Sequence, residues 1–140
     1  MDGKIKHLEM IQGVINRMAS NSFVLKGWTV VLISALFALA ARDSNKLYIY
    51  LAYFPSLAFW VLDGYFLRQE KLYRKLYDKV RNTKESDIDF SMDTTLLTKE
   101  VHTWSEVILS VTLSVFYGAS ILTILLVMMV STKMIGVMRG

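Results

Sequence analysis

The chain contains no cysteine, one proline and seven glycines among its 140 residues. Without cysteine it can form no disulfide, thiol nucleophile or thiolate metal site. Glycine-rich phosphate loops and the glycine-flanked serine of hydrolases are also missing, and the only histidines, His7 and His102, lack metal-ligand spacing. We therefore expect a protein that is not an enzyme and that holds no metal or cofactor.

Apolar sequence is abundant instead. Three apolar stretches, Ser22 to Ala41, Leu47 to Leu67 and Val107 to Val130, each have about the length that a helix needs to cross ~30 Å of hydrocarbon. The charged residues, 20% of the chain, must therefore lie mostly outside the spans. The sequence predicts an all-α membrane protein with three transmembrane helices. In the alternative topology the first stretch lies flat and only two helices cross.

The basic residues are distributed unevenly. Four of the 16 Lys and Arg residues precede Trp28, and eight more lie between Arg68 and Lys99. If three helices cross, these twelve share one side, which the positive-inside rule assigns to the cytoplasm. We expect a cytoplasmic N-terminus and an external C-terminus. Ala38-Leu39-Ala40 resembles a signal-peptidase site, but two acidic residues precede it, so we expect the segment to be retained as a span.

The first half of the chain divides into two segments. Residues 1–21 show apolar positions every three or four residues, which predicts an amphipathic helix that lies on the membrane surface, packs on its neighbours or makes an oligomer contact. Residues 22–67 form a transmembrane hairpin, and the polar residues 19–22 are expected to break the first helix and cap the next. The alanine-rich outer half of the first span would allow another helix to approach closely. Pro55 is expected to kink the second span, with a gating hinge as the alternative.

The second half also divides into two segments. Residues 68–103 are expected to form a cytoplasmic basic helix, continuous with the second span, and an acidic loop. The apolar stripe of Leu72, Leu76 and Val80 on this helix should pack on something. Residues 104–140 form the third span and a short tail. Thr103 and Glu106 have the spacing of a capping box that would begin this span.

Three charged residues lie near the predicted membrane depth: Lys26, Asp63 and Glu106. Lys26 and Asp63 both fall toward the cytoplasmic ends of their helices and could form an ion pair across the hairpin. An unpaired charge in lipid is costly, so such residues are functional candidates. Snorkelling of the side chains to the interface is the alternative.

The third span carries small and hydroxyl-bearing residues at four-residue spacing, followed by apolar ones. Copies arranged around an axis would enclose a lumen with an acidic mouth, a hydroxyl-lined half and a hydrophobic constriction that could gate by dewetting. The predicted pore-lining and gate residues are Glu106, Ser110, Ser114, Tyr117, Ile121, Ile124 and Met128. Ordinary helix packing, within or between protomers, is the alternative for this face.

A basic surface follows the second span. Such juxtamembrane clusters usually attract anionic lipid, but they can also bind a partner or an anionic nucleotide ligand. The predicted ligand or partner-binding residues are Arg68, Lys71, Arg74, Lys75, Lys79 and Arg81.

Four short runs carry a resemblance: His7 to Gln12, Asn21 to Phe23, Lys26 to Trp28 and Leu67 to Glu70. They resemble a widespread group of small bacterial membrane proteins. The size and layout also resemble the membrane effectors of bacterial anti-phage defence systems that act with a nucleotidyltransferase-type partner, as in Hailong-like systems. This second resemblance implies a homo-oligomeric pore, such as a tetramer, controlled by the partner or a nucleotide ligand, whose opening depolarises the infected cell.

One chain has too few spans to surround an aqueous path, so conduction requires a homo-oligomer. We expect an oligomeric ion channel or membrane-permeabilising effector of the bacterial inner membrane, in contact with membrane lipids. A non-conducting anchor or adaptor that recruits a soluble partner is the first alternative. A small transporter subunit is the second.

Overall fold

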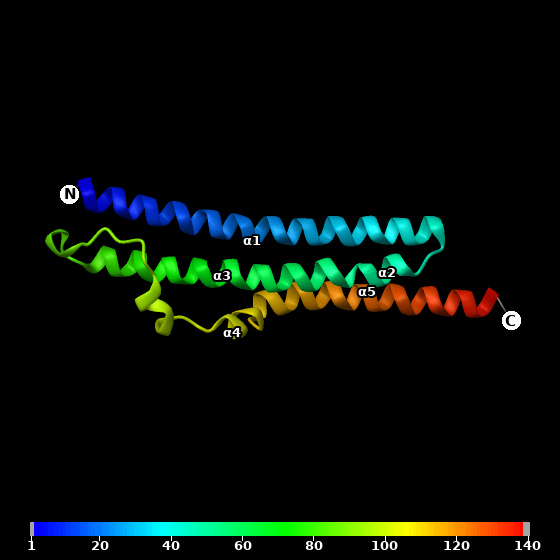
Figure 1. Ribbon diagram of the computed structural model, residues 1–140. Helices are drawn as coiled ribbons and strands as arrows, with labels where there is room; N and C mark the ends of the chain where they lie inside the picture. Colours follow the sequence, from blue (N-terminus) through cyan, green and yellow to red (C-terminus); the bar gives the residue numbers. More distant parts are fainter. Residues whose placement is uncertain (1, 139–140) are drawn as a thin grey trace. The chain divides into compact units, whose positions relative to one another are not determined.

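The computed structural model describes residues 2–138, with side chains described for residues 2–133. The described chain contains no strand and forms only helices and loops (Figure 1). The helices are α1 (Asp2–Asp43), α2 (Leu47–Leu51), α3 (Tyr53–Asn82), α4 (Trp104–Ile108) and α5 (Val111–Met138), with short 3-10 helices η1 (Glu85–Asp87) and η2 (Thr95–Glu100). Three segments are long and apolar enough to cross a membrane: Asp2–Asp43, Leu47–Asn82 and Val111–Lys133. The prediction of an all-α chain with three such helices is confirmed.

The chain divides into two compact units. Unit 1 comprises Met1–Phe23 and Asp63–Ile108, and unit 2 comprises Val24–Leu62 and Leu109–Gly140. The boundaries fall inside α1 and α3, so both helices contribute to both units. Unit 1 contains most of the basic residues, whereas unit 2 contains most of the apolar stretches.

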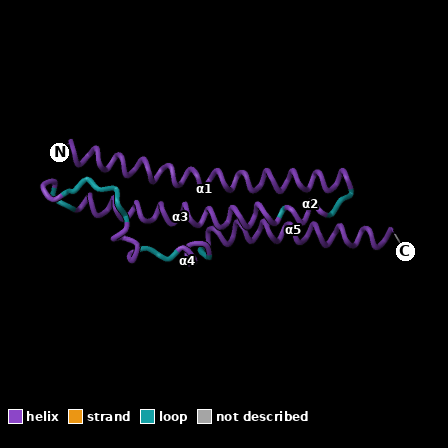
Figure 2. Tube along the Cα trace, in the orientation of Figure 1, coloured by secondary structure: helices purple, strands orange, loops and turns teal. Residues whose placement is uncertain are grey.

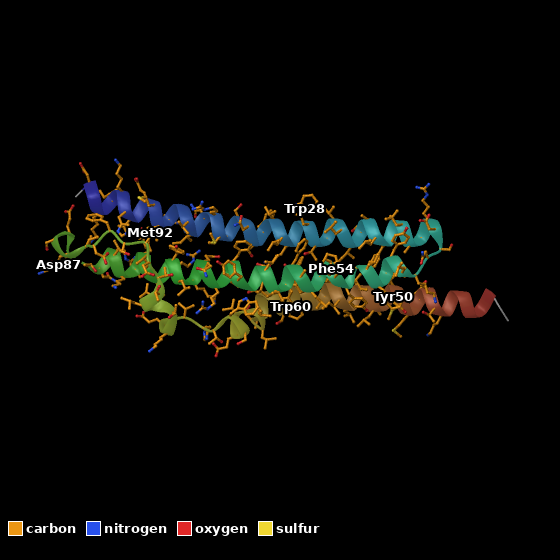
Figure 3. All side chains as sticks on the ribbon, viewed as in Figure 1. Trp28, Tyr50, Phe54, Trp60, Asp87 and Met92 are labelled. Carbon is orange, nitrogen blue, oxygen red and sulfur yellow. The ribbon has the colours of Figure 1, made fainter. Side chains whose placement is uncertain are left out.

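Unit 1 has a core built from three segments. Its buried members are Ile11 and Ile15 of α1, Leu72, Leu76 and Val80 of α3, and Leu97 of η2. Met92, labelled in Figure 3, packs against this core from the loop that follows α3. The N-terminal helix therefore packs on neighbours within the chain, and the apolar stripe of α3 has the packing partner that its sequence predicts. α3 also continues past the second apolar stretch to Asn82, as expected.

Polar contacts hold the loop after α3, drawn in teal in Figure 2, against the start of α1. The Lys4 ammonium donates hydrogen bonds to the carbonyl oxygens of Arg81 at 2.9 Å and Thr83 at 2.7 Å, which satisfies groups at the end of α3. The His7 Nε2 lies 3.2 Å from the carbonyl oxygen of Ser91, and the His7 ring contacts that of Phe90 at 5.6 Å. Unit 1 is thus stabilised by hydrogen bonds between the loop and α1 as well as by its apolar core.

Unit 2 has a separate apolar core. Its buried members are Ile33 of α1, Ile49 of α2, Ala52 between α2 and α3, and Ile124 of α5. In this unit α5 lies alongside α2 (Figure 1). The Trp60 and Tyr117 rings stack with centroids 5.9 Å apart and planes at 9°, which adds an aromatic contact between α3 and α5. Side chains fill the middle of this unit.

The predicted break at residues 19–22 is wrong, because α1 runs through them without interruption. Ser22 is buried, and its hydroxyl donates a hydrogen bond to a carboxylate oxygen of Asp63 on α3. The polar side chain is therefore satisfied by a neighbouring helix. It does not need to cap a new one.

Pro55 lies just after a one-residue interruption of the second span, at Ala52. A proline has no N–H for the carbonyl four residues earlier, and its ring would collide with that carbonyl in a straight helix. The residue four positions before Pro55 is Leu51, where α2 ends. Pro55 instead occupies the first turn of α3, a place where a missing N–H costs little. The Ala52 N–H closes the junction by donating to the Ile49 carbonyl oxygen at 3.2 Å.

Candidate functional site

The capping box at Thr103 is present, but it begins α4 and not the third span. The Thr103 N–H donates to Glu106 Oε2 at 2.7 Å, and the Glu106 N–H donates to Thr103 Oγ1 at 3.4 Å. The hydrogen bonds from the backbone and hydroxyl of Thr103 lower the pKa of Glu106. α4 ends at Ile108 and α5 begins at Val111, so the predicted helical face shared by Glu106 and Ser110 does not exist.

Two of the predicted pore residues are buried inside the protomer. Tyr117 and Ile124 are both 0% exposed within unit 2, where side chains of the same chain cover them, and a role for them in lining a lumen between copies stays a prediction. Ser114 and Ile121 are half-buried, and Met128 packs against the unit 2 core. The hydroxyl of Ser110 is buried and has no hydrogen-bond partner among the described residues. Tyr117, Ile124 and Met128 thus pack within the chain, and a pore-lining role for the remaining residues of this face stays a prediction.

A different helix presents small side chains outward. We call the exposed residues Gly27, Ser34, Ala38 and Ala41, with the larger Val31 among them, the α1 seam. They fall within a narrow arc of the helix, opposite the buried residues Thr29 and Ile33. A β-carbon at Gly27 would meet nothing within 4 Å, so nothing within the described residues fills the space beside it.

Small residues also recur along α1 in a seven-residue repeat that includes three members of the seam. Gly13, Ser20, Gly27, Ser34 and Ala41 follow one another at seven-residue intervals. A seven-residue repeat keeps side chains on one side of a helix. This signal was present in the sequence. Trp28 projects outward beside the seam (Figure 3), so large side chains flank the small ones.

The two residues of the predicted ion pair belong to different units. In unit 1 the Asp63 side chain is 0% exposed and accepts the hydrogen bond from Ser22. In unit 2 the Lys26 ammonium lies 6.0 Å from the centroid of the Phe116 ring, at the limit of a cation–π contact. Pairing between Lys26 and Asp63 remains a prediction.

Unit 1 contains an open groove of about 710 Å³ on the outer side of α3. One wall is α3, and the other is the segment that joins η2 to α4. The lining residues are Lys71, Arg74, Lys75, Asp78, Lys99, Glu100, Val101, His102, Thr103 and Glu106. We call this the basic groove. The Arg68 Nε donates to the His102 carbonyl oxygen at 3.2 Å, which ties the second wall to α3.

Several charges of the basic groove are already compensated. Arg74 pairs with Glu70 at 2.8 Å, and Asp78 lies 3.6 Å from Arg81. Glu106 accepts from Thr103 and lies 3.5 Å from the His102 Nδ1. By contrast, no ion pair within the described residues engages Lys71, Lys75 or Lys99. The groove thus presents three ammonium groups that are available to a ligand.

The structure brings together only part of the predicted basic surface. Lys71, Arg74 and Lys75 line the groove, whereas Arg68 braces its wall and Arg81 pairs with an acidic neighbour. Lys79 lines a smaller depression of about 210 Å³, whose other lining residues include Asp87, Asp89 and Asp93. Lys99 and His102 were missed, because only the folded loop places them opposite α3. No group of His, Asp and Glu within residues 2–138 could hold a metal ion.

No protein-family model, curated protein or solved structure matches this chain. The fold and site alone therefore define its class. It is an all-helical chain, compatible with a multi-pass membrane protein, in which one unit carries an exposed seam of small residues and the other carries a basic groove.

Proposed function

We propose that the protein is a homo-oligomeric ion channel or membrane-permeabilising effector of the bacterial inner membrane. Unit 2 is embedded in the bilayer, and unit 1 lies on the cytoplasmic side, where the positive-inside rule puts the basic residues. The observation that carries the proposal is the α1 seam, an exposed row of small residues on a helix long and apolar enough to span a membrane.

The α1 seam supports self-association for a physical reason. Lipid tails are as apolar as leucine, so helices in a bilayer associate through close packing, and small residues allow the backbones to approach. Gly27, Ser34 and Ala38 give such an approach to a helix from outside the protomer, because the chain's own helices pack on the opposite side of α1. A second copy of the chain supplies that helix.

Conduction then requires a path between protomers. The core of unit 2 is filled by Ile33, Ile49 and Ile124, so a single copy provides no aqueous route. In the proposed oligomer the α1 seam packs each protomer on the next around a common axis, and the aqueous path runs along that axis beside the packed seams. This arrangement replaces the α5 lumen that the sequence predicted.

Regulation enters through unit 1 in this proposal. A cytoplasmic nucleotidyltransferase-type partner, or a nucleotide that it makes, controls opening, and opening depolarises the cell in anti-phage defence. Support for this biological role comes only from the resemblance in size and layout described above.

The test is ion flux through liposomes that contain the purified protein. Ala38→Leu fills the α1 seam, and we expect it to disrupt the oligomer and abolish flux. Ala119→Leu makes the same change at an exposed position of α5 and should leave both unchanged. Wild-type liposomes that are silent while the oligomer stays intact would contradict conduction.

A non-conducting membrane adaptor is the second candidate. It is favoured by the separate core of unit 1 and by the basic groove, which together make a docking module of adequate size. An intact oligomer without flux, combined with loss of partner binding when Lys71 and Lys75 are changed to Glu, would support the adaptor over the channel.

A further inference from the structure

The basic groove has the charge and the position to hold a lipid headgroup. We infer that it binds an acidic membrane phospholipid through its phosphates, and that a lipid with two phosphodiester groups matches it best. This site rests on the proposed function only in that unit 2 is embedded in a bilayer. It does not require that the protein conduct ions.

The first argument is charge. Lys71, Lys75 and Lys99 line the groove without an ion-pair partner among the described residues, and of its carboxylates Glu100 has neither an ion pair nor a side-chain hydrogen bond there. Arg74 is paired with Glu70 and Asp78 with Arg81, whereas the Glu106 carboxylate keeps its negative charge, because the hydrogen bonds that it accepts do not cancel it. The groove is therefore left with an excess of one positive charge, and its three ammonium groups, on two walls, can contact more than one phosphate.

The second argument is depth along α3. The apolar stretch ends at Leu67, and at about 1.5 Å per residue Lys71 lies about 6 Å and Lys75 about 12 Å farther along the helix. The headgroup region on each side of a bilayer is roughly 5–8 Å thick. Lys71 therefore falls at the depth of the lipid phosphates. The side chain of Lys75 is long enough for its ammonium group to bend back toward the same depth.

Aromatic residues mark the same level. Tyr65 is half-exposed and its ring contacts that of Phe66 at 5.6 Å, just before the basic residues begin. Trp104 is exposed at the start of α4, next to the groove-lining His102 and Thr103. Tyr and Trp are enriched where membrane proteins meet the headgroups.

The third argument is the size of the groove and the hydrogen bonds that fix its walls. The volume of about 710 Å³ is far larger than one phosphate needs, so the groove can accept a headgroup with its glycerol backbone. The hydrogen bond from Arg68 to the His102 carbonyl and the Thr103–Glu106 capping box fix the second wall, so Lys99 and the α3 lysines stay on opposite sides of the ligand. Basic pockets of this kind bind the headgroups of acidic phospholipids.

The experiment titrates the detergent-solubilised full chain with cardiolipin and counts bound lipids by native mass spectrometry. The double variant Lys75→Gln/Lys99→Gln removes two groove charges. The control, Lys6→Gln/Lys84→Gln, removes the same charge at exposed positions outside the groove. We expect binding to weaken about 30-fold in the groove variant, which follows from the usual contribution of each basic residue near an anionic lipid, and to change little in the control.

Two further arms identify the source of the phosphate. Phosphatidylglycerol, with one phosphodiester, should bind more weakly than cardiolipin, and ATP should not compete with either lipid. Equal cardiolipin binding by the groove variant and its control would overturn the inference. So would ATP binding that depends on Lys75 and Lys99 while lipid binding does not, because the groove would then serve a soluble ligand.

Discussion

Leu72 offers the sharpest test of how unit 1 is built. Its side chain is 2% exposed and belongs to the core that joins α1, α3 and η2, so Leu72→Ala removes contacts with all three. Leu96 provides a matched control, since it lies in η2 of the same unit but is 82% exposed.

The expected magnitude follows from burial. Replacing a fully buried leucine by alanine costs about 2–5 kcal/mol, through the lost transfer free energy and the cavity left behind. The core of unit 1 is small and its loop wall can partly collapse, so we expect about 3 kcal/mol for Leu72→Ala. Leu96→Ala should change the stability by less than about 0.5 kcal/mol, as surface substitutions usually do.

Amide hydrogen exchange of the protein in mild detergent measures the difference. A loss of about 3 kcal/mol raises the exchange of the protected α3 amides near Leu76 and Val80 by about 150-fold, because each 1.4 kcal/mol is a factor of ten. The amides of α1 around Ile11 should accelerate together with them. Equal effects of Leu72→Ala and Leu96→Ala, or acceleration confined to α3, would refute the packing of unit 1 described above.

Three further predictions concern single contacts. A β-carbon at Gly64 would overlap the Ile108 side chain, so Gly64→Val should displace the α4 segment and speed trypsin cleavage at the exposed Lys99 in η2, just before it, whereas Gly13→Val, where a β-carbon meets nothing, should not. Hydrogen bonds from Thr103 lower the pKa of Glu106 below its ordinary 4.5, so the α4 cap is fully formed above that pH and is lost as the pH falls through the lowered value. The Thr103 amide shift in NMR spectra should follow this titration, and Glu106→Gln should abolish it. Finally, Ser22→Ala and Asp63→Ala should be non-additive in thermal unfolding, with a coupling of about 1–3 kcal/mol, because each removes one end of the same buried hydrogen bond; full additivity would argue against the contact.

Local sequence patterns predicted the elements of this fold well. The apolar stretches located the three helices that are long and apolar enough to cross a membrane, and the stripe of Leu72, Leu76 and Val80 indicated a packed extension. The capping box at Thr103 is present, although it begins α4 and not the third span. Each of these features depends on residues within a few turns of one another, so the sequence holds the necessary information.

Features that depend on distant residues were predicted poorly. Ser22 looks like a helix cap until Asp63 is placed beside it, and the face of α5 that carries Tyr117 looks available until Trp60 stacks on it. Lys99 could not be assigned to a site before the loop put it opposite Lys71. The seven-residue repeat of small residues along α1, which shares Gly27, Ser34 and Ala41 with the α1 seam, is different, since it was visible in the sequence and needed only a comparison at seven-residue intervals.

The position where copies meet can be measured directly, because the chain has no native cysteine to interfere. Single cysteines are introduced at Ser34, in the exposed α1 seam, and at the adjacent buried Ile33, and the membranes are treated with an oxidant. The proposed homo-oligomer predicts a disulfide-linked dimer for Ser34→Cys and none for Ile33→Cys. Failure of Ser34→Cys to cross-link in membranes that retain the intact protein, or equal cross-linking at both positions, would contradict association through α1.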